Sequence, residues 1–444
     1  MQESADGFVA GPIMAGGCFK EPAVLVVFSE NPARCRPEWR VKAVLAARQS
    51  CAQRDRLERE FDRRNTIAMR KTEQLLRELV ALPSVNPAFL PAGHEHAGEG
   101  RVGDFLAAKA VDAGLEVEFQ DVLPGRSNLV VRLPPSGRIR SRILLAPHLD
   151  TVPAATLSQF TPIRKSGRLF GRGACDTKGS VAAMFTAICR LARSARRPKE
   201  TEIVFAGLVD EENAQAGSRA LVRGGFKADL AIVGEPTRLR VVTAHKGSVW
   251  FRLETCGKSA HGARPELGRN AVHAMARIVE ALETDYAEGL RGRRHALLGA
   301  ATVNVGVIRG GTQPNIVPDR CVIEVDRRTL PGETDSGVRR EVAGFLKARG
   351  LQAGFESSKD APCRPLETAP GLALVRQFLA CAGQRNPSGV DFFCDAAVLA
   401  GGGMPSVVFG PGDIAQAHTA QEWIDLEQLD RAADLLEAFL QSLP

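Results

Sequence analysis

Acidic side chains directly follow an apolar segment of this sequence. The run TEIVFAGLV is followed at once by Asp210, Glu211 and Glu212. Adjacent carboxylates repel one another, and burying even one costs on the order of several kcal/mol unless a cation or a hydrogen-bond donor compensates. We therefore expect a positive charge at this point of the fold.

The same kinds of side chain end other apolar segments. RILLAPHLDTVP contributes His148 and Asp150, which lie on the same side of an extended segment because they are two residues apart. Asp176 in GRGACDTKGS precedes a predicted helix, Glu235 ends the run LAIVGEPT, and His418 lies far downstream in GPGDIAQAHTAQEW. In open α/β sheets, ligands bind beyond the carboxyl ends of the strands, so these loops can converge on one site.

Two histidines and several carboxylates suit Zn²⁺ or a similar divalent ion, and one carboxylate can bridge two ions about 3.5 to 4 Å apart. In such a site we expect Asp150 to fix the tautomer of His148 from outside the coordination shell. Glu211 and Glu212 are expected to alternate at a strand end, so that one binds metal while the other faces the substrate as a general base. Asp210 would then cap or hydrogen-bond the loop.

Taken one at a time, these residues have ordinary structural explanations. A histidine in a loop is usually structural or exposed, an acidic pair usually lies in a solvated turn, and Glu235 before Pro236 could simply begin a loop. The repetition favours a metal site, because several apolar segments end in groups that are costly to bury without compensation.

Helical and strand patterns alternate through two parts of the chain, 69–243 and 359–444. The alternation predicts an α/β catalytic domain with a mixed, mostly parallel sheet flanked by helices. The predicted helices cover 71–85, 101–114, 180–194, 218–225, 371–383 and 426–443, and the predicted strands cover 115–122, 128–133, 142–150, 201–210, 230–236 and 405–411.

The intervening segment, 244–358, has a different pattern. Strands that alternate apolar and polar residues are predicted within 241–257, 301–311 and 321–329, and amphipathic helices at 268–284 and 336–350. This pattern predicts a smaller inserted α+β domain of the ferredoxin-like type.

Composition limits the classes of partner and location. The net charge is +7, but basic residues are interspersed with acidic ones and aromatic residues make up only 5%, so a nucleic-acid partner is not expected. No apolar run approaches the roughly 20 residues that cross a bilayer. Ten cysteines without a C-x-x-C pair fit a reducing compartment. We therefore predict a cytoplasmic protein with no membrane partner.

Residues 1–68 stand apart from both predicted domains. A Gly-rich start is followed by RQSCAQRDRLEREFDRRN, which could form a solvated helix. This N-terminal extension is predicted to be disordered or partly helical, and it contains no candidate chemistry.

Nine short segments, taken in their order along the sequence, carry a family resemblance. APHLDTVP, GRGACDTKG, VDEEN, IVGEPT, AHKG, SAHG, NIVPDRC, DRRTLPGE and FGPGDIAQAH together resemble the acetylornithine deacetylase and succinyl-diaminopimelate desuccinylase family of dinuclear metal amidohydrolases. The resemblance runs from about residue 70 to the C-terminus.

The resemblance implies a role for each candidate residue. It implies two divalent metal ions per chain, Zn²⁺ first and Co²⁺ as the alternative, with Glu211 as the general base that deprotonates the attacking water. The implied ligands are His148, Asp176 and Glu235 for the first ion, and Asp176, Glu212 and His418 for the second.

Three residues of the inserted segment also match family positions. His261 is implied to support the oxyanion from the partner subunit, which makes a homodimer the expected assembly with the inserted domain as its lid. Arg328 and Asn315 match positions that hold the substrate's carboxylate. Their ordinary explanations stay open: His261 could be a surface residue, Asn315 could satisfy a turn, and Arg328 could pair with Asp326 or Glu333.

The expected substrate is an N-acyl amino acid, with N-acetylornithine first. Where the desuccinylase has a Gly-Thr-Ser-Asp run that binds the succinyl group, this sequence has GVDFFCDAA, with Phe393 and Cys394 before Asp395. This departure disfavours succinyl-diaminopimelate. An aminoacylase, a dipeptidase or a carboxypeptidase remains open. So does a non-catalytic binding protein, such as one that recruits an acidic partner through its basic surface or N-terminal extension.

Overall fold

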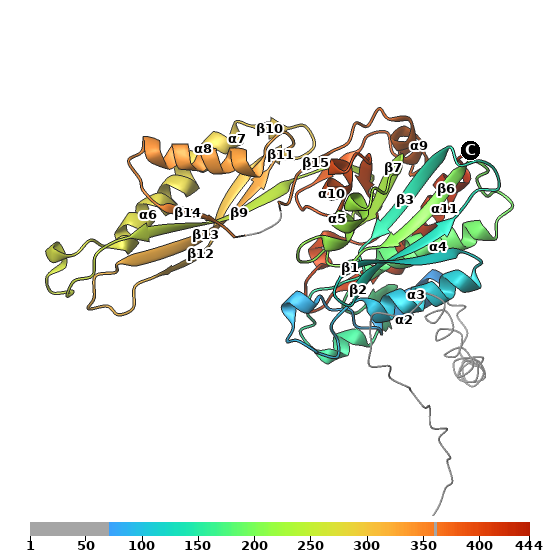
Figure 1. The fold of residues 1–444 in the computed structure, drawn as a ribbon, viewed down its shortest axis with the longest axis horizontal. Coiled ribbons are helices and arrows are strands. Elements are labelled where there is room, and N and C mark those ends of the chain that lie inside the picture. The colour runs from blue at the N-terminus through green and yellow to red at the C-terminus, as the bar shows by residue number, and fades with distance from the viewer. Residues whose placement is uncertain (1–70, 359–361) are drawn as a thin grey trace, which may run out of the picture. The chain divides into compact units, whose positions relative to one another are not determined.

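A computed structural model of the protein describes residues 71–358 and 362–444 (Figure 1). The prediction for residues 1–68 lies outside the described residues. Within those residues, no helix has both the length and the apolar character that crossing a membrane requires.

The main sheet is mixed, with strand order β1-β2-β6-β3-β7-β17-β8-β15 and with β16 paired to β8. The central neighbours β6, β3, β7 and β17 run parallel, as β16 does to β8. The β1–β2, β2–β6, β17–β8 and β15–β8 pairs are antiparallel. The predicted mixed α/β sheet is confirmed, with parallel pairing at its centre. Its strands are β1 (Glu116–Leu123), β2 (Arg126–Leu133), β3 (Ser141–Pro147), β6 (Thr201–Gly207), β7 (Leu230–Gly234), β8 (Val242–His245), β15 (Leu366–Glu367), β16 (Ser388–Val390) and β17 (Ser406–Val408).

Helices cover both faces of this sheet (Figure 1). The central strands are apolar along nearly their whole length, as expected for strands with two covered faces. Because successive side chains point to opposite faces, Ile143 and Leu145 join one hydrophobic cluster and Leu144 joins another. The first cluster includes α2 (Lys71–Val80), α3 (Gly100–Asp112), α4 (Lys178–Ala192), α9 (Ala373–Cys381) and α11 (Leu426–Gln441), and the second includes α5 (Ala216–Arg223) and α10 (Ala396–Gly401).

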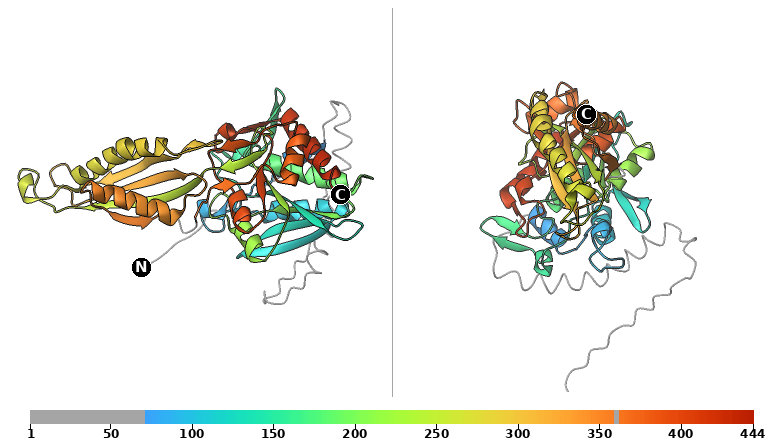
Figure 2. Two further views of the ribbon diagram at one scale, coloured as in Figure 1. Left: turned by 90° about the horizontal axis from the view of Figure 1, so that it is seen from above. Right: turned by 90° about the vertical axis from the view of Figure 1, so that its left-hand side faces the viewer.

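A second sheet, of order β12-β13-β9-β14, is built from the inserted segment. Strands and helices follow one another in the order βαββαβ, which is the ferredoxin-like arrangement that the sequence predicts. Side chains from one face of this sheet and from its helices form a separate core, and Figure 2 shows the helices lying across that face. The elements are β9 (Gly247–Cys256), α6 (Ala271–Ala281), the π-helical turn η6 (Leu282–Tyr286), α7 (Ala287–Arg291), β12 (Thr302–Gly310), β13 (Arg320–Thr329), α8 (Asp335–Ala348) and β14 (Gly354–Ser357).

The chain leaves the main sheet and returns to it at neighbouring strands. β8 ends at His245, two residues before β9 begins, and β15 brings the chain back. Leu366 of β15 pairs antiparallel with His245. The exit and the return of the inserted segment are therefore joined by strand pairing.

Short strands tie distant segments together in a small sheet of order β18-β5-β4. Trp423 of β18 pairs with Phe170 of β5, so the chain that follows His418 is fixed to the chain that precedes Asp176. Sequence patterns did not predict these three-residue strands. The remaining short elements are β4 (Ile163–Lys165), β5 (Arg168–Phe170), β18 (Trp423–Asp425), β10 (Arg294–His295), β11 (Gly299–Ala300), η3 (Pro87–Phe89), η4 (Leu157–Phe160), η5 (Pro265–Leu267) and η7 (Ile414–Gln416).

Candidate metal centre and active site

The carboxyl ends of three neighbouring strands form the candidate site. His148 follows β3, the turn at 211–214 follows β6, and Glu235 follows β7. Because these strands are parallel neighbours, their ends lie at the same edge of the sheet. Asp176, two residues before α4, and His418, five residues before β18, reach this edge from other parts of the chain.

Glu211 and Glu212 do not alternate at a strand end, and that prediction is wrong. β6 stops at Gly207, and both glutamates lie in the turn at 211–214. Asp210 precedes the turn with φ 69°, a left-handed conformation that asparagine and aspartate tolerate better than most residues. The turn nevertheless separates the two carboxylates, because each falls in a different group of potential ligand atoms.

Imidazole and carboxylate atoms gather into two overlapping groups. Nε2 of His148 lies 3.1 Å from Oδ1 of Asp176 and 3.9 Å from Oε1 of Glu235. Nε2 of His418 lies 3.3 Å from Oδ2 of Asp176 and 3.2 Å from Oε2 of Glu212. Each oxygen of Asp176 therefore faces a different histidine, which is the arrangement that a bridging carboxylate needs.

Ligand atoms within 4.8 Å of one another form the triples His148, Asp176, Glu212 and His148, Glu211, Glu235. These triples differ from the ligand sets that the resemblance implies, since His148 and Glu212 share the first triple and Glu211 enters the second. A carboxylate oxygen of Glu211 thus lies within 4.8 Å of ligand atoms of His148 and Glu235.

Burial dominates the electrostatics of the three glutamates, and repulsion from neighbouring carboxylates adds to it. Burial raises the pKa of Glu211 well above its usual range, and the charge of Glu235 adds to the effect. Burial likewise raises the pKa of Glu235, against an opposing effect of His148. Burial and the charge of Asp176 raise the pKa of Glu212 to about 7. Hydrogen bonds to Asp176 and Glu212 raise the pKa of His418 to about 10.

These residues fit divalent cations. Oε1 of Glu212 is buried without a hydrogen-bond partner among the described residues, although burying an ionised oxygen without compensation is costly. Four carboxylates share the site with two imidazoles, so two protonated histidines would not balance the charge once all four carboxylates are ionised. Mixed imidazole and carboxylate donors of this kind suit Zn²⁺ and related ions.

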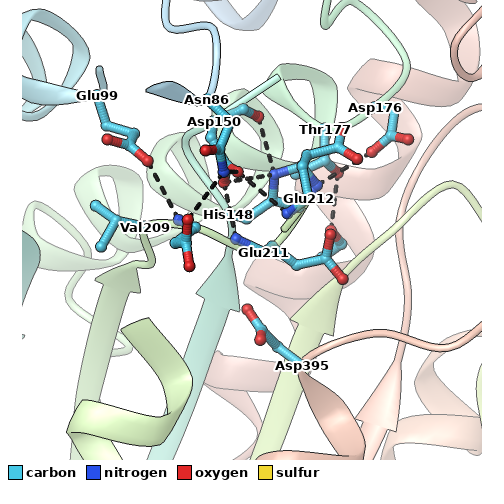
Figure 3. A network of polar contacts seen from close by, with 12 residues as sticks. Asn86, Glu99, His148, Asp150, Asp176, Thr177, Val209, Glu211, Glu212 and Asp395 are labelled. Atoms are coloured by element: carbon cyan, nitrogen blue, oxygen red, sulfur yellow. Dashed lines mark hydrogen bonds and ion pairs between the residues drawn. The ribbon is translucent and has the colours of Figure 1, made fainter. Parts of the chain in front are cut away.

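Asp150 connects one imidazole to the glutamate turn (Figure 3). The backbone carbonyl of Asp150 accepts a hydrogen bond from Nδ1 of His148 at 3.0 Å. The side-chain Oδ1 of Asp150 lies farther from the same nitrogen, at 3.4 Å. Nδ1 therefore carries the proton, and Nε2 is free to face Asp176. The Asp150 carboxylate accepts hydrogen bonds from the backbone amides of Glu211 and Glu212, both at 3.1 Å.

The family model described as "Peptidase family M20/M25/M40" matches residues 144–442, from within β3 to just past the end of α11. The chain belongs to this peptidase family.

Relatives of the M20 chain agree with this assignment. Acetylornithine deacetylase of Myxococcus xanthus is 35% identical over 353 residues, which cover 75% of this chain and 89% of that protein. Acetylornithine deacetylase of Vibrio campbellii is 30% identical, with coverage of 76% and 90%. The resemblance stated from the ordered motifs is confirmed.

Solved structures share the M20 fold. Aminopeptidase PepT from Bacillus cereus has a TM-score of 0.68 and 26% identity, with coverage of 84% of this chain and 97% of that one. A Bacillus subtilis M20 peptidase described as dinuclear metal binding has a TM-score of 0.59 and 17% identity, with coverage of 83% and 96%. The second match supports the fold alone.

A polar clamp that sequence patterns missed holds the glutamate turn of this M20 site. Arg126 donates to both oxygens of Glu99 and, at 3.0 Å, to Oδ1 of Asp210. Nδ2 of Asn86 donates to Asp150 at 2.7 Å and to Asp210 at 3.1 Å. The prediction that Asp210 hydrogen-bonds within its own loop is thus too narrow. Its side chain is held by Arg126 and Asn86, which lie 84 and 124 positions away in the sequence.

Asp395 is a further buried carboxylate on the β7 side of the M20 site, and its side chain points toward the Glu211–Glu212 turn in Figure 3. The hydroxyl of Ser218 donates to Oδ1 of Asp395 at 2.5 Å, while Oδ2 has no hydrogen-bond partner among residues 71–358 and 362–444. Burial raises the pKa of Asp395 to about 6. In the sequence, Asp395 stands out only as part of a departure from the desuccinylase pattern.

The structure places His261 and Asn315 together on the inserted part. His261 forms a bridge with Ile316, and the amide of Gly262 donates to the carbonyl of Asn315 at 2.7 Å. Both side chains are exposed, and neither contacts a candidate metal ligand among the described residues. Arg328 donates to Oδ2 of Asp326 at 2.8 Å, which is one of its two ordinary pairings.

The metal-free protein is expected to lose stability as pH rises from 5 to 8. Glu212, with its pKa raised from 4.5 to about 7, keeps its proton longer in the folded than in the unfolded chain, so stability falls across that interval. His418, raised from 6.5 to about 10, stabilises fully below 6.5 and progressively less above it. Asp176, whose pKa is lowered from 3.8, contributes a constant amount above pH 5.

Thermal unfolding in the presence of a chelator measures this trend. The melting temperature should decrease steadily between pH 5 and pH 8, and added Zn²⁺ should remove the decrease because the ion binds the deprotonated ligands. A melting temperature that rises with pH in the metal-free protein would contradict the electrostatics described above.

Proposed function

We propose that the chain hydrolyses the amide bond of an N-acyl amino acid in a metal-dependent reaction, with N-acetylornithine as the first candidate substrate. The observation that carries the proposal is Asp176, which faces His148 with one oxygen and His418 with the other. Membership in the M20 family supports hydrolysis of amides, and the two relatives named acetylornithine deacetylase support the substrate class.

The proposed cofactors are two divalent ions, Zn²⁺ first and Co²⁺ as the alternative. Bound at the candidate site, they would polarise the amide carbonyl and lower the pKa of water. The proposed ligands are His148, Asp176 and Glu235 for one ion, and Asp176, Glu212 and His418 for the other. Oε1 of Glu212, which is buried without a hydrogen-bond partner in the described part of the chain, supports this assignment.

Glu211 is the proposed general base. Its raised pKa suits a carboxylate that accepts a proton from the attacking water and then donates it to the departing amine. The two backbone hydrogen bonds from the turn to Asp150 fix where that carboxylate lies. Asp150 is thus proposed to act by holding both the base and the imidazole of His148.

The remaining proposed roles belong to the inserted part. His261 would support the oxyanion across a homodimer, and its exposure beside the equally exposed Asn315 suits a residue delivered to another subunit. Arg328 and Asn315 would hold the substrate's carboxylate, for which Arg328 must exchange its pairing with Asp326. A cytoplasmic location is proposed from the cysteines, which are free thiols among the described residues.

A substrate panel tests the ranking of substrates. The zinc-loaded protein should hydrolyse N-acetylornithine with a higher kcat/KM than N-succinyl-diaminopimelate, N-formyl amino acids, other N-acetyl amino acids, dipeptides and tripeptides. Release of the free amine measures the rate for every member of the panel. Fastest turnover of the succinyl compound would reverse the ranking, and fastest turnover of tripeptides would move the chain toward the aminopeptidase that it resembles in fold.

A further inference from the structure

Glu422 is a fully buried carboxylate that the proposed reaction does not use, and it binds the loop that carries Asp176. Its Oε2 accepts hydrogen bonds from Nη1 of Arg172 at 2.7 Å and from the amide of Gly173 at 2.9 Å. Its Oε1 accepts from the amides of Cys175 at 2.8 Å and Asp176 at 2.9 Å. One carboxylate thus receives four donors from residues 172–176.

These contacts fix the backbone of the proposed bridging ligand. The amide of Asp176 is itself one of the donors, although 246 residues separate it from Glu422. Hydrogen bonds to an ionised carboxylate are stronger than bonds between neutral groups, and both oxygens are satisfied. The Asp176 side chain is therefore carried on a backbone that has little freedom to shift.

The same segment carries His418, four residues before Glu422. The His418 ring is 55% exposed, so packing does little to hold it, and its backbone has a left-handed φ of 63°. The segment is instead held at its C-terminal end. The amide of Gly171 donates to the carbonyl of Glu422 at 3.0 Å, and β18 begins at the next residue. Glu422 thus directly precedes β18, and its buried side chain holds the chain four residues after the exposed ligand candidate His418.

The two proposed ions depend on this anchor to different degrees. His148 and Glu235 follow β3 and β7, so the main sheet positions them directly. Asp176 and His418 lie on the two segments that Glu422 joins. The second ion takes two of its three proposed ligands from those segments, whereas the first takes only one.

We propose that Glu422 is a positioning residue for the second metal ion, because it holds the Asp176 loop against the segment that carries His418. The inference rests on the proposed metal-dependent function. Loss of the Glu422 charge should loosen the second ion and leave the first largely in place.

The test is Glu422→Gln in the full chain, stripped of metal and dialysed against buffered free Zn²⁺, with bound zinc measured per chain. Glutamine keeps the shape but offers only one acceptor oxygen, and its amide nitrogen would face N–H donors. Wild type should bind two ions. The variant should bind the first with a Kd within about threefold of wild type and the second about 10- to 100-fold more weakly, as changes outside the ligand shell typically do.

Glu427→Gln is the matched control, because Glu427 is exposed on α11 and should leave both binding steps unchanged. A Glu422→Gln curve identical to wild type, or an equal weakening of both steps, would overturn the inference while two-ion binding by wild type still supports the proposed function. Wild type that binds fewer than two ions would overturn both. If Glu422→Gln does not fold, Glu422→Asp replaces it: the shorter side chain cannot reach all four donors, and an unchanged second step would then refute the role.

Discussion

Replacing Glu211 by glutamine is expected to lower kcat by about 10²- to 10⁴-fold, the range that a general base typically contributes. The substitution removes the group that accepts the proton and preserves its size. KM should change little, because the proposed ligands and the residues for the substrate's carboxylate are untouched. Steady-state rates on the best substrate of the panel, together with zinc content per chain, measure the two effects.

Glu212→Gln is the internal control for that experiment, since it neutralises the neighbouring glutamate of the same turn. It should lower zinc content, because Oε2 of Glu212 lies 3.2 Å from Nε2 of His418 in the proposed second ion site. If Glu211→Gln instead lost zinc while its remaining zinc-loaded fraction kept full activity, the roles of the two glutamates would be exchanged.

Asp176→Asn is expected to weaken both metal ions at once. Asp176 faces His148 and His418 with different oxygens, and asparagine retains only one acceptor oxygen and no charge. Affinity at both positions should fall by more than the roughly 10- to 100-fold that outer-shell changes cause. Thermal stabilisation by zinc should fall with it, from about 2.7 kcal/mol at a concentration 100 times the wild-type Kd toward zero.

Asp434→Asn supplies the control for Asp176→Asn. Asp434 lies on α11 with an exposed side chain that pairs with Arg190, so its loss should not alter zinc content or the zinc-dependent rise in melting temperature. Full zinc content in Asp176→Asn would contradict the bridging role of Asp176. The proposed function, which rests on that role, would then lose its main support.

The main sheet and much of the candidate site could be predicted because their signals are local. Continuous apolar runs predicted β3, β6 and β7, and polar residues directly after those runs pointed to the shared sheet edge. The spacing of His148 and Asp150 predicted a connection between them, and Nδ1 of His148 donates to the backbone carbonyl of Asp150. Periodicity also predicted the helices that flank the sheet.

What could not be predicted depends on partners that are distant in the chain. Asn86 contacts Asp150 across 64 residues, and Glu422 contacts Asp176 across 246. No periodicity or spacing encodes such pairs, since each partner alone is an unremarkable polar residue in a loop. The turn at 211–214 differs from the predicted strand end because the apolar run continues through Val209, beyond the end of β6 at Gly207.

The pairing of Leu366 with His245 has a consequence for how this protein can diversify. An inserted segment that begins and ends on adjacent, hydrogen-bonded strands can become longer or shorter, or change its surface, without shifting the register of the main sheet. Surface changes on the inserted segment can therefore alter selectivity while the main sheet keeps its strand register.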